Sequence, residues 1–288
     1  MKHLLIISIF FSLLILFTAN GFAQFGGTAD LSGAKVRVYK TIGDKQLKLY
    51  MYQPKNHKLE DRRPSIVFFF GGAWRINNIG QFIEHSKYFA SRGMVSLLSD
   101  YRVKSLDDVT PIQCISDAKS AIRWVRGHAK ELGIDSSRIV AAGGSSGGHL
   151  AACTALLKQF DEKNEDLKVS SAPNALVLFN PVLDTSMIPG FGDKAVAASP
   201  IHHVSRGSPP TIIFHGTADS AVPFSRALRF CEVMKKNGNR CELVPFEGKQ
   251  HGFFNYGQGD GKDYIITIRA ADEFLTSLGY LEGKPTIK

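Results

Sequence analysis

Residues 138–148 read Arg138-Ile139-Val140-Ala141-Ala142-Gly143-Gly144-Ser145-Ser146-Gly147-Gly148, and they are the strongest indication of the fold. Its first five residues are a short apolar run that predicts a buried strand, and a helical pattern follows at 148–159. A G-x-S-x-G pattern lies between them, in which a serine is held on a sharp turn from strand to helix. The stretch therefore predicts a nucleophilic serine at the end of a sheet strand.

Glycine-rich turns between a strand and a helix also bind phosphates, which gives a second interpretation of the same stretch. No Lys-Ser/Thr pair follows the glycines, and no G-x-G-x-x-G is present, so the nucleophile turn is favoured. The pattern fits both Ser145 and Ser146. Because Ala142 is the last apolar residue of the strand, we predict that Ser145 is the nucleophile and that Ser146 contributes its backbone amide.

The remaining chain predicts a parallel sheet covered by helices. Short apolar runs recur at 65–70, 95–98, 138–142, 175–179, 211–214 and 241–246, and helical patterns occur at 81–91, 112–132, 148–159, 225–236 and 263–278. Strands without polar alternation are buried on both faces. Two extended segments, 35–41 and 46–53, precede them and predict a hairpin around Gly43-Asp44. Such doubly wound sheets gather their functional residues at the carboxyl ends of the strands.

A serine hydroxyl needs an adjacent base, and His251 is the candidate among nine histidines because it follows the last predicted strand. Its carboxylate partner should stand at another strand end. Asp219, after the run at 211–214, is favoured over Asp184, after the run at 175–179. The order Ser145, Asp219, His251 is also the order that accompanies this kind of serine turn.

The oxyanion of an acyl-transfer intermediate needs backbone N–H donors that are already in place. Phe70-Gly71-Gly72-Ala73-Trp74 follows the first buried strand, where glycines let the backbone approach a substrate. We predict the amides of Gly72 and Ala73 as donors, with the amide of Ser146 as the third. A plain turn is the alternative.

Four motifs in order resemble those of the hormone-sensitive-lipase-like esterases. Residues 70–74, 143–151, 215–223 and 251–253 are similar to H-G-G-G-W, G-x-S-A-G-G-H-L-A, H-G-x-x-D-x-x-V-P and H-G-F. The nearest branch is the bacterial carbohydrate acetyl and feruloyl esterases, and the resemblance spans residues 35–280. It implies an α/β-hydrolase fold with a mostly parallel eight-stranded sheet, helices on both faces and a minimal cap at 184–208. Phe70 stands where the motif has histidine, and Ala73 where it has its third glycine. A backbone oxyanion hole survives both changes, but the altered side chain leaves the alcohol-side pocket undefined.

The first residues predict export. A basic start, an apolar run at 4–17, and Gly21 and Ala23 are typical of a signal peptide cleaved after Ala23. A membrane anchor is the alternative, but the run is short for a span of about 20 residues. We therefore expect a signal peptide at 1–23, an extension at 24–34, a catalytic domain at 35–284, and a secreted or periplasmic protein.

Composition narrows the partners. Hydrophobic residues make up 44% and charged residues 21% of the chain, and although the net charge is +9 the basic residues are scattered, so no nucleic-acid partner is expected. The four cysteines fit no zinc spacing, and we expect no metal or cofactor. Cys114 and Cys153 fall on apolar helix faces, whereas Cys231 and Cys241 are candidates for a disulfide.

The sequence thus predicts a secreted serine carboxylesterase that hydrolyses short, acetyl-type esters. A small cap leaves an open cleft, so an acylated polysaccharide or glycoside, as in an acetyl xylan esterase, is the preferred substrate over a buried lipid chain. The alternatives are a serine peptidase or amidase of the same fold, and a noncatalytic homologue. The exact acyl group, the alcohol and the oligomeric state stay open.

Overall fold

The computed structural model describes residues 29–288, and within this range eight strands form one sheet. The strand order is β1-β2-β4-β3-β5-β6-β7-β8. Pairing is antiparallel between β1, β2 and β4 and parallel from β4 to β8, which confirms the predicted mostly parallel sheet. The strands are β1 (Lys35–Ile42), β2 (Lys45–Tyr52), β3 (Arg63–Phe69), β4 (Val95–Ser99), β5 (Ile134–Gly144), β6 (Ala175–Phe179), β7 (Thr211–Gly216) and β8 (Cys241–Phe246).

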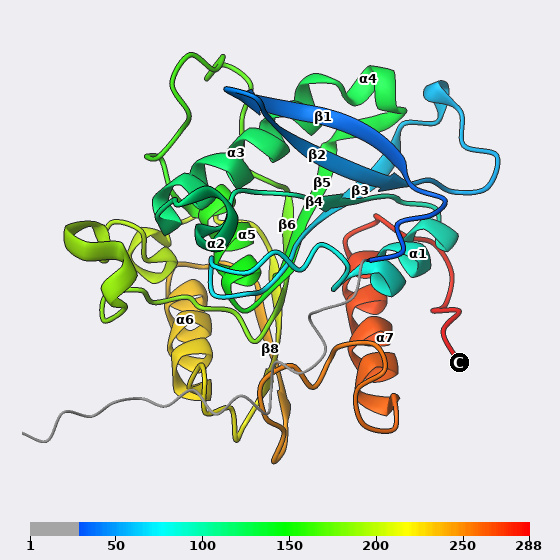
Figure 1. Ribbon diagram of the computed structural model, residues 1–288. Helices are drawn as coiled ribbons and strands as arrows, with labels where there is room; N and C mark the ends of the chain where they lie inside the picture. Colours follow the sequence, from blue (N-terminus) through cyan, green and yellow to red (C-terminus); the bar gives the residue numbers. More distant parts are fainter. Residues whose placement is uncertain (1–28) are drawn as a thin grey trace, which may run out of the picture.

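Helices cover both faces of the sheet (Figure 1). The longer ones are α1 (Ile83–Ser91), α3 (Pro111–Gly127), α5 (Ser146–Leu156), α6 (Phe224–Lys236) and α7 (Lys262–Ser277). The short ones are α2 (Lys104–Asp107) and α4 (Ala129–Leu132), with 3-10 turns η2 (Leu59–Asp61), η3 (Pro189–Lys194) and η4 (Pro200–His203). Helices α1 and α7 pack on one face, while α3, α5 and α6 pack on the other. None of the described helices has the length and apolarity that a membrane crossing requires.

Two elements differ from the sequence-based expectation. The helix predicted at 112–132 divides at His128, whose ring stacks on Trp124 with centroids 4.1 Å apart and whose Nδ1 lies 2.9 Å from the Trp124 carbonyl. The His128 backbone N–H also donates to this carbonyl, at 3.0 Å, and His128 itself leaves the helical conformation with φ −102° and ψ 15°. Strand β5 is longer than predicted at both ends. Ile134 pairs with Arg63 of β3 at its start, and at its end Gly143 pairs with β3 and Gly144 with β6. Its last residue therefore lies directly before Ser145.

A disulfide links Cys231 in α6 to Cys241 at the start of β8, with Cα atoms 5.4 Å apart. A closed loop of this size contributes about 2–3 kcal/mol in the chain-entropy model. Cys114 and Cys153 are free and buried, as the apolar helix faces predict. Burial raises the pKa of the Cys114 thiol, so it stays protonated.

His85 of α1 is buried in a group of aromatic rings on the α1 and α7 face of the sheet. Its ring meets those of Phe82, Phe179 and Tyr264 at centroid distances of 4.9, 5.5 and 4.9 Å. Within residues 29–288 neither ring nitrogen has a hydrogen-bond partner. Burial lowers the pKa of His85 from 6.5 to about 3. The folded protein therefore holds a neutral, unpaired imidazole, which costs free energy.

Acid should destabilise the fold through this residue. The unfolded chain protonates the ring below about pH 6.5 and the folded chain only near pH 3, so stability falls as the pH is lowered through that window. We expect His85→Leu to raise Tm at pH 5 by about 2–6 °C, with a smaller gain at pH 7.5. Thermal unfolding at both pH values tests this, with exposed His202→Leu as the control. An equal gain at the two pH values would contradict it.

Candidate active site

Ser145 occupies the turn between β5 and α5 in a strained conformation, with φ 54° and ψ −120°. The residues two positions before and after it must be glycines: a Cβ on Gly143 would come within 2.6 Å of the Phe69 carbonyl oxygen, and one on Gly147 within 2.0 Å of the same atom. The Ser145 N–H donates to the Phe179 carbonyl at 2.9 Å. Ser145 is partly exposed, whereas the Ser146 side chain is buried and points away from solvent. The geometry thus favours Ser145 over Ser146 as the reacting hydroxyl.

Asp219 and His251 are in direct contact. Asp219 Oδ2 lies 2.8 Å from His251 Nδ1, while Asp219 Oδ1 accepts the amides of Ala221 and Val222, both at 2.9 Å. Burial acts to raise the pKa of Asp219, but hydrogen bonds from His215 and His251 outweigh it and hold the pKa well below its usual range. The carboxylate is therefore ionised and fixes the His251 tautomer with Nδ1 protonated.

The rival carboxylate, Asp184, has a different role. Its Oδ1 accepts hydrogen bonds from Ser186 and Ser199 at the start of the segment between β6 and β7. It thereby organises that segment and makes no contact with His251. Buried His215, four residues before Asp219, has its Nε2 2.8 Å from the Val222 carbonyl and holds the turn that carries Asp219.

The segment 179–182 connects Ser145 with the Asp219–His251 pair. Ser145 donates to the carbonyl of Phe179 and accepts from the amide of Val182 at 3.2 Å. Between these two contacts, Asn180 places its Nδ2 3.2 Å from His251 Nε2, the nitrogen that a serine base must use. The three predicted residues therefore share one end of the sheet, with Asp219 and His251 joined directly and Ser145 one segment away.

The predicted oxyanion loop, residues 70–74, lies against the nucleophile. A Cβ on Gly71 would be 3.3 Å from Ser145 Cβ. Gly72, Ala73 and Trp74 all have positive φ, at 149°, 53° and 58°. Among residues 29–288 no acceptor takes the amides of Gly72 or Ala73. Unpaired N–H groups beside a candidate nucleophile are the arrangement that an oxyanion requires.

Three side chains restrain this strained loop. The Tyr101 hydroxyl donates to the Phe70 carbonyl at 2.7 Å, and Gln81 Oε1 accepts the Gly71 amide at 2.6 Å. Trp74 Nε1 donates to His149 Nδ1 at 3.3 Å. Burial lowers the pKa of His149 to about 4, so the neutral ring can accept this bond. Non-glycine residues keep positive φ only where the surroundings enforce it, and these contacts do so.

Phe70 departs from the esterase motif for a reason visible in the core. It is buried, and its ring stacks on Tyr101 with centroids 4.1 Å apart. The Phe70 side chain is therefore part of the hydrophobic core, where its stacking on Tyr101 gives it a structural role.

Comparison with known proteins identifies the family. The BD-FAE family model matches residues 49–193, half of the chain. The chain belongs to this family of α/β-hydrolase esterases. The prolyl oligopeptidase family model matches residues 184–275. Apo Thermogutta terrifontis esterase 2 is 52% identical, with 88% of this chain and 98% of that chain covered and a TM-score of 0.87. The same esterase with butyrate bound is 50% identical over the same shares, with a TM-score of 0.86.

Curated relatives of this α/β-hydrolase are more distant and longer. A probable carboxylic ester hydrolase, LipM, of Mycobacterium tuberculosis is 29% identical over 88% of this chain and 66% of its own length. A probable isoprenylcysteine alpha-carbonyl methylesterase of Arabidopsis thaliana is 29% identical over 71% of this chain and 48% of its own length. The chain thus spans about half to two thirds of these relatives.

The motifs of the sequence do not point to three amide side chains of the site, those of Asn180, Gln81 and Asn255. Gln81 and Asn255 hydrogen-bond to each other although 174 residues separate them. Asn180 could have been suspected, since it ends the run at 175–179 directly before Pro181. Gln81 and Asn255 belong to no motif. Within residues 29–288, no group of three or more His, Cys, Asp or Glu side chains is placed to hold a metal ion.

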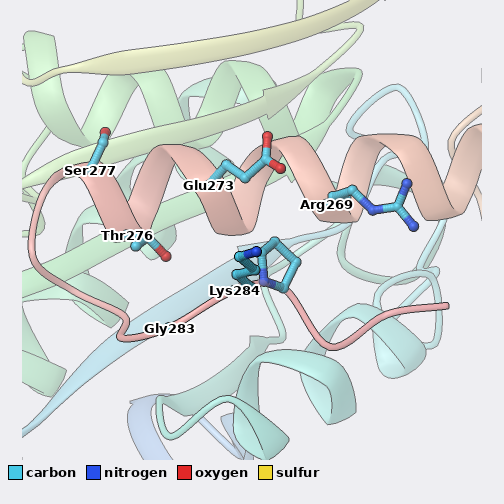
Figure 2. Close-up of a pocket in the computed structure, with 7 residues that line it drawn as sticks. Arg269, Glu273, Thr276, Ser277, Gly283 and Lys284 are labelled. Atoms are coloured by element: carbon cyan, nitrogen blue, oxygen red, sulfur yellow. The ribbon is translucent and has the colours of Figure 1, made fainter.

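A separate cavity of about 560 Å³ lies between α7 and the C-terminal tail (Figure 2). Its lining comprises Arg269, Glu273, Thr276, Ser277, Gly283, Lys284 and Pro285. Most of these residues are exposed, and both charge signs are present. None of the predicted site residues of this α/β-hydrolase contributes to it.

Proposed function

We propose that this protein is a serine carboxylic ester hydrolase in which Ser145 attacks, His251 is the general base and Asp219 orients it. The observation that carries the proposal is the 2.8 Å contact of buried Asp219 with His251, at the sheet end where Ser145 occupies a strained turn. Membership of an esterase family supports it.

The proposed mechanism uses only these side chains and water. His251 Nε2 takes the proton of the Ser145 hydroxyl as its oxygen attacks the ester carbonyl. His251 then gives that proton to the leaving alcohol. Water, deprotonated by the same nitrogen, hydrolyses the acyl-enzyme. Ionised Asp219 stabilises the imidazolium that forms at each step.

The negative charge of each tetrahedral intermediate needs donors that are already oriented. The amides of Gly72 and Ala73 are unpaired and directly follow Gly71, which lies beside Ser145, and the amide of Ser146 is the third proposed donor. Ser146 is also the first residue of α5, so the positive end of the helix dipole supports the oxyanion.

Short acyl esters are the proposed substrates, with an acylated polysaccharide or glycoside as the preferred alcohol part. The segment between β6 and β7 holds only the 3-10 turns η3 and η4, so little apolar cap is available for a long chain. The similar Thermogutta terrifontis esterase 2 has been solved with propionate and with butyrate bound. The match of residues 184–275 to the prolyl oligopeptidase family favours a peptidase or amidase as the second candidate.

The two adjacent serines test the mechanism. Ser145→Ala should lower kcat by about 10⁴- to 10⁶-fold, as loss of a triad nucleophile does. Ser146→Ala keeps the backbone amide and should stay within about threefold of the unmodified protein. Steady-state hydrolysis of p-nitrophenyl acetate measures both, and thermal unfolding confirms that both fold. The reverse ranking of the two variants would move the nucleophile by one residue.

A substrate panel tests the specificity. We expect hydrolysis of p-nitrophenyl esters from acetate to butyrate. Activity should fall steeply for acyl chains longer than about eight carbons, because a small cap buries little apolar surface at about 25 cal/mol per Å². Acetylated xylan should release acetate, and matched p-nitroanilides should be poor substrates. A preference for long acyl chains would refute the assignment of short acyl groups. If acetylated xylan released no acetate, the proposed polysaccharide substrate would be refuted. Efficient cleavage of the anilides would favour the amidase function.

We also propose export through a signal peptide at residues 1–23, a segment that lies outside the described residues. The disulfide between Cys231 and Cys241 supports it, since such bonds persist in oxidising compartments. The protein recovered from its own cells should begin at Gln24. Mass spectrometry of the intact chain measures this, and a retained Met1 would refute the proposal.

A further inference from the structure

Two loops reach the proposed active site from distant parts of the chain. The oxyanion loop, residues 70–74, follows β3, and the His251 loop, residues 247–255, follows β8. Catalysis by the proposed mechanism requires the donors on one loop and the base on the other to keep a fixed separation. A shift of about 1 Å in such geometry can cost 10²-fold in rate.

A pair of amide side chains connects the two loops. Gln81 Nε2 donates to Asn255 Oδ1 at 3.0 Å. On its other side Gln81 Oε1 accepts the amide of Gly71 at 2.6 Å. Asn255 Nδ2 donates to the carbonyl of Gly252, the residue after His251, at 2.9 Å. The result is a continuous chain of hydrogen bonds from Gly71 to Gly252.

The bonding pattern fixes the orientation of both amides. Gln81 must present oxygen to an N–H and nitrogen to Asn255, while Asn255 must present nitrogen to a carbonyl and oxygen to Gln81. Neither side chain can rotate its amide by 180° without placing two donors or two acceptors against each other. Both residues are half-buried, which limits competition from water.

The contact at Gly71 also selects the oxyanion donors. Because the Gly71 amide is bound to Gln81, it is not available to a substrate, whereas the next two amides are unpaired. Gly72 and Ala73 follow with positive φ, a conformation that relaxes unless it is held. Gln81 holds the end of the loop nearest Ser145.

We propose that Gln81 and Asn255 are positioning residues that form an amide bridge between the oxyanion loop and the His251 loop. The bridge keeps the Gly72 and Ala73 amides in register with His251 and touches no substrate. This inference rests on the proposed serine-esterase function.

A double-mutant cycle with Gln81→Met and Asn255→Leu tests the bridge. Each single variant should lower kcat on p-nitrophenyl acetate about tenfold with KM within about twofold. The double variant should be no worse than about tenfold, because both changes break the same connection. Paraoxon provides an active-site titration: His251 takes the Ser145 proton, the Ser145 oxygen bonds to phosphorus, and the bond to p-nitrophenolate breaks. The released p-nitrophenolate counts the reacting sites, and kcat expressed per site excludes misfolded molecules.

Asn77→Ala is the matched control, since it removes an amide from the same segment whose bonds go to Asp100 and Ile79. It should lower Tm but leave kcat within about twofold. Unchanged kcat in the single variants, multiplicative losses in the double variant, or an effect on KM alone would each overturn the bridge. An inactive unmodified protein, or an active Ser145→Ala variant, would instead overturn the proposed function.

Discussion

The turn from β5 into α5 passes so close to the end of β3 that no side chain fits at Gly143 or Gly147. This steric constraint shapes the whole site. It forces Ser145 to a positive φ, which turns its side chain out of the sheet while the flanking backbone pairs with β3 and β6. The same close approach places the start of the oxyanion loop, which continues directly from β3, beside the serine.

The turn that carries Asp219 and the oxyanion loop differ in how their polar groups are satisfied. The Asp219 carboxylate is buried, yet it receives two backbone amides and two imidazole contacts, so its ionised form is favoured. A buried carboxylate that is this fully solvated by the protein is a fixed charge. In the oxyanion loop, by contrast, the amides of Gly72 and Ala73 have no hydrogen-bond acceptor among the described residues. A fixed negative charge that orients a base, together with unpaired N–H donors in the loop next to the serine turn, is suited to acyl transfer.

The predictable parts of this molecule are those in which local sequence carries the physics. Continuous apolar runs predict the strands from the sequence. The glycines at 143 and 147 follow from a steric requirement that only glycine meets. The amide bridge is different, because Gln81 and Asn255 acquire a role only through the distant partner that the fold supplies. The division of the helix at His128 is likewise invisible in the apolar pattern, because it comes from the non-helical backbone of a single residue.

The small cap is also tied to the site by packing. Phe191 of η3 meets the rings of Trp74 and His149 edge-on, at 5.0 and 5.4 Å. Trp74 is the last residue of the oxyanion loop, and His149 lies one turn of α5 beyond Ser145, with its amide bonded to the Ser145 carbonyl. Buried aromatic and imidazole rings therefore connect the cap, the oxyanion loop and the nucleophile turn. Since such close-packed groups resist independent movement, strain at Ala73 and Ser145 persists in a rigid site rather than relaxing into the loops.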